Sequence, residues 1–218
     1  KRFEGAKQTS EPDEIDHAGP VIIAGVGRFG QIVNRLVESS GFKTVVLDNN
    51  LKRIQLMRSF GYRAFLGDPT RPELLRAAGL RDARVLVVSL DDTEAGLRLV
   101  RHARKERPDI HIIARARDRG HVFALYEAGA NDIVRELFDS SLRAGRYVLE
   151  NVGMTEYEAA EAEQAFYAHD RMALKELAQL WKPDQDMASN EAYRKRVREL
   201  EKELELSLQA LAEKKDSA

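Results

Sequence analysis

The stretch GVGRFG, at residues 25–30, constrains the fold of this chain more than any other part of the sequence. The apolar run Val21–Ala24 precedes it and a helical pattern follows it. In a strand–loop–helix unit, the first glycine allows a tight turn, the second lets a phosphate approach the backbone, and the third allows close helix–strand packing. The helix N-terminus adds partial positive charge at the same place. The pattern therefore predicts a nucleotide site formed by Gly25, Gly27, Arg28, Phe29 and Gly30.

Short β-branched runs alternate with helical patterns from residue 19 to about residue 135. Most of the runs lack polar residues at alternate positions, as expected of strands that are buried on both faces. This alternation predicts right-handed βαβ units and an α/β fold, with a Rossmann-like, doubly wound parallel sheet. The strands are expected at Val21–Ala24, Thr44–Leu47, Arg63–Leu66, Val85–Ser89, Ile110–Ala114 and Asp132–Val134, and the helices at 28–40, 50–60, 71–78, 92–106 and 119–128.

The character of the sequence changes beyond Arg135, where Glu, Ala, Leu, Lys and Arg predominate. This composition predicts an all-helical C-terminal tail, with breaks at Asn151-Val152-Gly153 and Lys182-Pro183-Asp184. The three helices are expected at 139–150, 156–181 and 189–213. The polar N-terminal residues predict a linker or tail. We therefore expect a linker at 1–18, a nucleotide-binding domain at 19–135, connecting helices at 136–182 and a C-terminal helix at 183–218.

An apolar stripe runs along the last of these helices. Its members, which keep a three-four spacing, are Val197, Leu200, Leu204, Leu208 and Leu211. Such spacing places the side chains on one helix face. The pattern leaves two interpretations open: the stripe packs on its own domain, or it meets a partner chain.

A carboxylate follows the second expected strand, in the segment VVLDNN. Asp48 stands where a Rossmann fold places the acceptor for ribose hydroxyls, and it would repel a 2′-phosphate. The sequence therefore favours NAD(H), AMP or another adenosine nucleotide over NADP(H). Asp68 and Ser89 end neighbouring strands at the same edge and are further candidates for the adenosine pocket, or else turn and cap residues. In the alternative interpretation, Asp48 caps the next helix and the glycine loop is only a tight turn.

The charge balance excludes several classes of partner. The 218 residues include 35 basic and 36 acidic side chains, which argues against a duplex-wrapping or membrane-adhering protein.

The absence of cysteine excludes disulfides, a thiol nucleophile and a thiolate metal site. No apolar stretch reaches the ~20 residues that span a bilayer, and no signal peptide is visible. The chain begins at Lys1 rather than methionine, so we expect either a processed chain or a piece of a longer one, in which any membrane role would belong to a part outside this sequence.

The sequence supports binding more strongly than catalysis. It contains no H-E-x-x-H pattern, G-x-S-x-G elbow or P-loop, and its histidines form no catalytic or metal constellation. His121 is a candidate for a site, or simply the start of a surface helix. The segment IIARARDRG gathers Arg115, Arg117 and Arg119 at the end of the fifth strand, where they would pair with carboxylates or meet an anion.

Several segments, in order, resemble one known family. They are VIIAGVGRFGQIVNRL, VVLDNN, FGYRAFLGDPTRPELLRAAG, IIARARDRGHVFALYEAGA and VRELFDSSL. Together they resemble the cytoplasmic KTN domain, also called the RCK domain, of the bacterial Kef potassium efflux systems. The resemblance covers about residues 19–182 and, more weakly, the last helix. It is much more specific than the glycine pattern alone.

The resemblance implies a regulatory domain that binds an adenosine nucleotide, AMP or NAD(H), without hydride transfer, and that is not an enzyme. It implies a homodimer formed through the helices at 136–182, as their amphipathic pattern also suggests. It places the domain at the cytoplasmic face of the bacterial inner membrane, beneath a K⁺/H⁺ antiporter module absent from this sequence. Glutathione would keep efflux closed, and its electrophile conjugates would open it. An ancillary flavin-dependent quinone oxidoreductase-like subunit commonly docks on such domains.

The family's ligand residues fall on particular positions of this chain. The resemblance assigns glutathione binding to Arg35 and Arg135, since a guanidinium fork matches a carboxylate. It assigns the aromatic that senses a bulky conjugate to Phe60, for which an ordinary core position at a helix end is the alternative. The third ligand position is an asparagine in the family, whereas this chain has Asp170. Because a carboxylate cannot donate as an amide does, this departure puts the third contact in doubt.

Two other functions remain open on the sequence alone. One is a small NAD-dependent oxidoreductase, which the glycine loop alone would also fit. The other is a KTN domain of another potassium transporter or channel, which answers to nucleotide or calcium rather than glutathione. Nicotinamide absorbance and a glutathione titration separate these possibilities.

Overall fold

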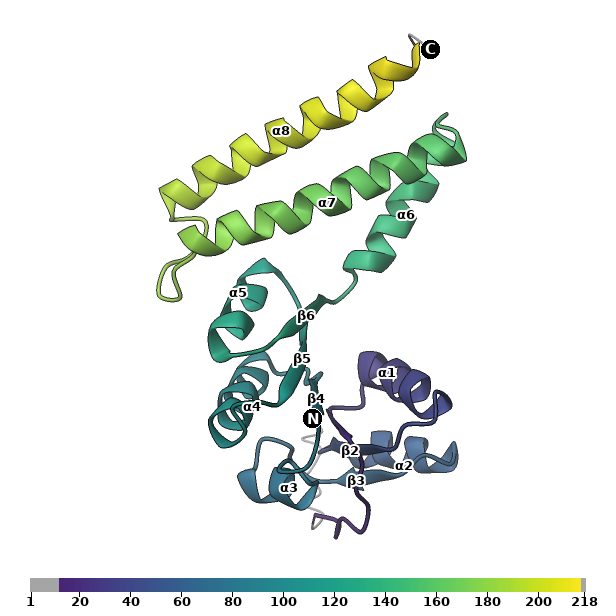
Figure 1. Ribbon diagram of the computed structural model, residues 1–218, viewed down its shortest axis with the longest axis vertical. Helices are drawn as coiled ribbons and strands as arrows, with labels where there is room; N and C mark the ends of the chain where they lie inside the picture. The colour runs from purple at the N-terminus through teal and green to yellow at the C-terminus, as the bar shows by residue number, and fades with distance from the viewer. Residues whose placement is uncertain (1–11, 217–218) are drawn as a thin grey trace, which may run out of the picture. The chain divides into compact units, whose positions relative to one another are not determined.

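The computed structural model describes residues 12–216 and contains the expected parallel sheet (Figure 1). Six strands lie in the order β3-β2-β1-β4-β5-β6, and the paired registers between β1 and β2, β1 and β4, β2 and β3, and β4 and β5 are parallel. The strands are β1 (Val21–Ala24), β2 (Thr44–Asp48), β3 (Ala64–Leu66), β4 (Val85–Val88), β5 (His111–Ala116) and β6 (Asp132–Arg135). The predicted Rossmann-like fold is therefore confirmed, and each strand begins and ends within two residues of its predicted bounds.

The right-handed crossover rule determines which face of the sheet each helix covers. Because the strand order runs one way from β1 to β3 and the other way from β4 onward, the helices before β3 and those after it cover opposite faces. Figure 1 shows α1 and α2 on one side of the sheet and α3 and α4 on the other. These helices, with α5, are α1 (Arg28–Ser39), α2 (Leu51–Ser59), α3 (Pro72–Ala77), α4 (Thr93–Glu106) and α5 (Arg119–Ala128).

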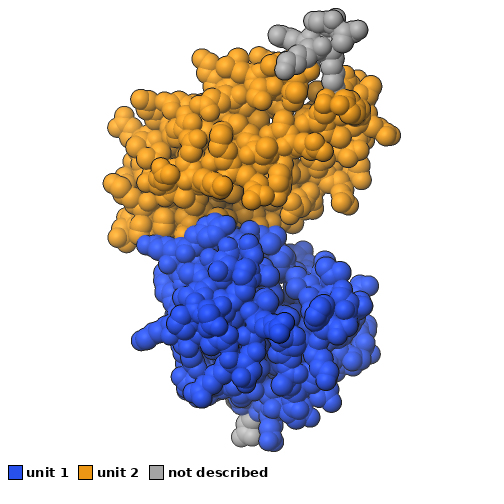
Figure 2. Space-filling view, in the orientation of Figure 1, with its two compact units in different colours: residues 1–116, 125–134 blue, residues 117–124, 135–218 orange. Residues whose placement is uncertain are grey.

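The chain divides into two compact units, which Figure 2 colours separately. Unit 1 comprises residues 1–116 and 125–134, and unit 2 comprises residues 117–124 and 135–218. The core of unit 1 is built by the central strands, where Ile22, Ile23, Val46 and Leu86 are fully buried. Burial on both faces explains why these strands read as continuous apolar runs in the sequence.

Part of the predicted N-terminal linker packs along the edge of the sheet. The backbone N–H of Asp13 donates to the Leu66 carbonyl at 2.9 Å, and its carboxylate accepts from the Leu66 N–H at 2.5 Å. Arg58 also donates to this carboxylate at 2.6 Å. These contacts cover the otherwise open edge of β3, which protects an edge strand from pairing with another chain. Residues 1–11 of the predicted linker lie outside the described part.

Unit 2 contains three longer helices, α6 (Phe138–Asn151), α7 (Glu156–Leu180) and α8 (Glu191–Asp216). Thr155 and Glu158 form a capping box at the start of α7, and Asn190 caps α8 by accepting from the Tyr193 N–H at 3.1 Å. Leu200 and Leu204 of the apolar stripe are buried, and α8 lies along α7 (Figure 1). The stripe therefore packs within its own chain, which was the first of the two interpretations. No helix among the described residues has the length and apolar character needed to span a membrane.

Candidate nucleotide site

The glycine loop connects β1 to α1 through a close backbone approach. Gly25 has a φ of +96°, and its N–H donates to the Leu47 carbonyl at 2.8 Å. An added Cβ at Gly30 would lie 2.1 Å from the Gly25 carbonyl oxygen, so only glycine fits there. The buried hydroxyl of Ser89 donates to the same carbonyl at 2.7 Å. Ser89 thus fixes the loop and is absent from the walls of the cavity described below.

Asp48 lies at the carboxyl end of β2, beside the loop. Its Oδ2 accepts from the Val26 N–H at 2.8 Å and its Oδ1 from the Asn50 N–H at 2.7 Å, while the side chain is almost fully buried. Asn50, rather than Asp48, caps α2, because its side chain accepts from the Arg53 N–H. Each carboxylate oxygen has a second lone pair, so Asp48 retains capacity to accept from ribose hydroxyls.

A cavity of about 300 Å³ opens at the carboxyl edge of the sheet, next to Asp48. Ligands of open α/β sheets bind at this edge, near the point where the strand order reverses. Asp68 lies on the wall, where its Oδ1 also accepts from the Thr70 N–H and hydroxyl, at 2.9 and 2.7 Å. The cavity is lined by Gly25, Asp48, Asn49, Arg53, Asp68, Pro69, Thr70, Leu90, Asp91, Asp92, Ala95 and Arg98.

Two further predicted residues begin α1. Arg28 is exposed in the first turn of this helix, and half-buried Phe29 packs against the core cluster that includes Ile23 and Val46. Gly27 is the N-cap of α1. Because glycine has no side chain, no N-cap side chain binds the N–H groups of the first turn, which is the arrangement found at phosphate-binding helix N-termini.

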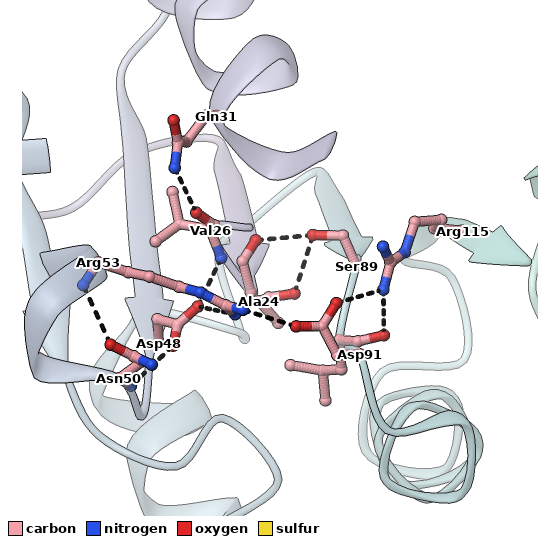
Figure 3. A network of polar contacts seen from close by, with 11 residues as sticks. Ala24, Val26, Gln31, Asp48, Asn50, Arg53, Ser89, Asp91 and Arg115 are labelled. Atoms are coloured by element: carbon pink, nitrogen blue, oxygen red, sulfur yellow. Dashed lines mark hydrogen bonds and ion pairs between the residues drawn. The ribbon is translucent and has the colours of Figure 1, made fainter. Parts of the chain in front are cut away.

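An ionic bridge crosses the site and joins α2 to the segment after β4 (Figure 3). Arg53 Nη2 lies 2.7 Å from Asp91 Oδ2, and Arg115 Nη2 lies 3.0 Å from Asp91 Oδ1. Arg115 is buried and also donates to the Leu90 carbonyl at 2.7 Å. The hydrogen bond from Arg53 is the largest cause that lowers the pKa of Asp91, and the same bond raises the pKa of Arg53. Of these three residues, the sequence singled out only Arg115.

The residues predicted to bind glutathione are distributed over both units. In unit 2, Arg135 and Asp170 form an ion pair, and Arg119 Nη2 lies 2.9 Å from the same carboxylate. The Arg135 guanidinium also stacks on Phe138, 3.6 Å from the ring centroid. Arg35 and Phe60 belong to unit 1, where Arg35 is exposed on α1. Phe60 is the C-cap of α2 and 62% exposed, which excludes an ordinary core position.

Both parts of the chain match known protein families. Residues 21–136 match the TrkA-N domain family, and residues 140–218 match the potassium efflux system KefB C-terminal domain. A curated relative is the glutathione-regulated potassium-efflux system protein KefC of Cronobacter sakazakii. It is 45% identical over 80% of this chain, which spans only 28% of that protein's length.

Two solved structures are also similar. The AMP-bound C-terminal domain of Kef from Shewanella denitrificans matches with a TM-score of 0.69 and 38% identity, over 76% of this chain and 100% of that one. The GsuK channel bound to NAD matches with a TM-score of 0.51 and 26% identity, over 61% of this chain and 23% of that one. The resemblance to Kef proteins is therefore confirmed: the chain belongs to the family of Kef C-terminal domains, in which a TrkA-N domain precedes a KefB-type C-terminal domain.

Proposed function

We propose that this chain is a ligand-sensing regulatory domain of a potassium efflux system, and that it binds an adenosine nucleotide without turning it over. The observation that carries this proposal is the cavity beside the glycine loop, with Asp48 at its wall. AMP in the related Kef domain, and NAD in the more distant GsuK channel, support an adenosine nucleotide as the occupant. NAD(H) and AMP are both compatible with Asp48, which accepts from ribose hydroxyls and repels a 2′-phosphate.

Asp48→Ala is expected to weaken AMP binding about tenfold or more, because the ribose loses a charged acceptor. Calorimetric titration of AMP measures the change. Asp82→Ala, which removes an exposed carboxylate outside the cavity, serves as the control and should bind like the parent. Unchanged affinity in Asp48→Ala would contradict the assignment. Steady turnover at the nicotinamide absorbance band would instead favour an oxidoreductase.

We further propose that glutathione and its conjugates are the regulatory ligands. The potassium-efflux relative is named for glutathione regulation. Arg35 offers an exposed guanidinium to a carboxylate, and Arg135 offers one that is paired with Asp170 in this structure. Glutathione carries two carboxylates, which such groups can bind. The exposed ring of Phe60 is a suitable sensor for bulk on the glutathione sulfur. Only a difference in affinity between two conformations allows such a ligand to shift the transporter between closed and open states.

Arg35→Ala and Arg135→Ala are each expected to weaken binding of reduced glutathione and of a bulky S-conjugate by about tenfold. Phe60→Ala should mainly reduce the difference between the two ligands. Arg101→Ala, an exposed arginine on α4, is the control. Calorimetry provides the affinities. If both arginine variants bind glutathione as the parent does, these roles are wrong; if the parent binds AMP but no glutathione, a nucleotide-answering channel domain is the better assignment.

We propose a homodimer formed through α6. This helix has no buried residue, and Tyr147 and Val148 are 55% and 60% exposed. An apolar groove of about 530 Å³, lined by residues that include Phe138, Leu149 and Phe166, lies against it. Exposed apolar side chains beside an apolar groove are typical of an interface.

Light scattering is expected to give twice the 24.6 kDa of one chain at micromolar concentration. Val148→Glu should shift the population toward the monomer, because it places a charge in the buried contact. Leu206→Glu changes an exposed leucine on α8 and should leave the mass unchanged. A monomeric parent would exclude the dimer.

In this assignment, the chain acts at the cytoplasmic face of the bacterial inner membrane. Its relatives are much longer than this chain, and we propose that their remaining length includes the K⁺/H⁺ antiporter module. Docking of a flavin-dependent quinone oxidoreductase-like subunit on this domain belongs to the same proposal. Co-purification of that subunit with the full-length transporter tests it.

A further inference from the structure

An ion pair, rather than open space, lies over the second glycine of the loop. A Cβ added at Gly27 would lie 3.7 Å from Arg53 Nη1 and 3.9 Å from Asp91 Oδ1. In strand–glycine–helix sites, the second glycine lets the backbone approach a phosphate. The place expected for a ligand phosphate is therefore beside a guanidinium and a carboxylate that bind each other (Figure 3).

The two arginines that hold Asp91 differ in their freedom to move. The Arg115 side chain is 6% exposed and also donates to the Leu90 carbonyl, so it is fixed. The Arg53 side chain is 37% exposed, and its Nη1 lies 3.6 Å from Asp48 Oδ2. Asp91 itself is 52% exposed at its side chain. If Arg53 leaves, Asp91 therefore keeps a charged partner.

We propose that Arg53 binds the phosphate of the nucleotide, and that Asp91 pairs with the guanidinium of Arg53 when no nucleotide is bound. This inference rests on the proposed nucleotide function and identifies the group that recognises the phosphate. A phosphate that binds at the loop replaces Asp91 as the partner of Arg53, and Asp91 stays paired with Arg115. Arginine suits this exchange because its planar fork binds carboxylate and phosphate in the same manner. Adenosine, which lacks a phosphate, cannot displace Asp91.

Removing any carboxylate from the cavity also makes the cavity more attractive to an anion. This general effect has to be separated from the exchange. Asp92 provides the matched control, because it lines the same cavity and follows Asp91 directly. Its side chain caps α4 by accepting from the Ala95 N–H at 3.0 Å, a bond that asparagine retains.

The experiment titrates AMP and adenosine into the parent, Asp91→Asn, Asp92→Asn and Arg53→Gln. Asp91→Asn is expected to bind AMP about tenfold more tightly than the parent, because the phosphate no longer competes with a carboxylate. Asp92→Asn should change AMP affinity by about twofold at most. Arg53→Gln should lose about tenfold for AMP and almost nothing for adenosine. Thermal unfolding without ligand checks that each variant is folded.

The outcomes separate this inference from the proposed function. If the parent binds AMP but Asp91→Asn binds it no more tightly than Asp92→Asn, the exchange is wrong. If Arg53→Gln weakens AMP and adenosine equally, Arg53 does not recognise the phosphate, and this result stands even if Asp91→Asn fails to fold. If the parent binds no AMP, the nucleotide function itself is wrong and the exchange with it.

Discussion

Gly30→Ala is expected to abolish the nucleotide site and to lower the stability of unit 1 by about 4 kcal/mol or more, which is the range of the most damaging substitutions. The new Cβ would lie 2.1 Å from the Gly25 carbonyl oxygen and 3.0 Å from the Ser89 hydroxyl. Neither group can move cheaply, since the carbonyl is backbone and Ser89 is buried and bonded to it. The clash forces α1 away from the loop, so the backbone can no longer surround a phosphate.

Circular dichroism during denaturation and calorimetry with AMP measure the two effects of Gly30→Ala. Gly96→Ala is the matched control in the same unit. Its Cβ would make an ordinary 3.8 Å contact with Val88, and alanine is favoured over glycine inside a helix by about 1 kcal/mol. We therefore expect Gly96→Ala to be neutral or stabilising. A Gly30→Ala chain with the parent's unfolding midpoint would show that the helix and loop are not closely packed there.

The sequence predicted the backbone of this site because the relevant signals are local. The glycines, the apolar strand before them and the carboxylate after the next strand all lie within 30 consecutive residues. Buried parallel strands have a continuous apolar pattern, which explains why the strand bounds agree so closely. Ser89 was predicted only as one of several possibilities, because its role depends on whether the hydroxyl faces the cavity or the loop.

The ionic partners were not predictable in the same way. Arg53 and Asp91 are separated by 38 positions, and Asp170 is separated by 51 from Arg119 and by 35 from Arg135. Charged residues are abundant in this chain, so a pattern cannot say which of them meet. The apolar stripe of α8 illustrates the same limit. Its spacing identified the buried face of the helix, but only the structure identifies α7 as the element that covers it.

Asp170 has a structural role in unit 2, in addition to its predicted role as a ligand contact. Its side chain is 3% exposed and it accepts from both Arg119 and Arg135. These arginines precede α6, one at the start of α5 and the other at the end of β6, whereas Asp170 is in α7. The ion pairs of this carboxylate therefore connect α7 to the start of α5 and the end of β6, which lie far from it in the sequence. A buried charge with two opposite partners is strongly coupled to the fold.

Asp170→Ala is expected to lower the stability of unit 2 by about 3 kcal/mol or more, because it leaves two arginines without their buried counter-charge. Trp181, the only tryptophan of the chain, packs 5.9 Å from Phe123 within unit 2, so its fluorescence during denaturation reports on this unit. Gln164→Ala, at an exposed position of the same helix, should change the stability by about 0.5 kcal/mol at most. All variants are compared at one protein concentration, since association also contributes to stability.

Asp170→Asn separates the charge of this residue from its hydrogen bonds. The amide oxygen still accepts from one arginine, so the expected loss of stability is smaller than in Asp170→Ala. Because the resemblance places an asparagine at this position in the family, the shape of the site should tolerate the amide. Equal losses in both variants would show that the charge accounts for the whole effect. If neither variant changes the fluorescence transition, the carboxylate does not hold α7, and the arginines are free to serve a ligand alone.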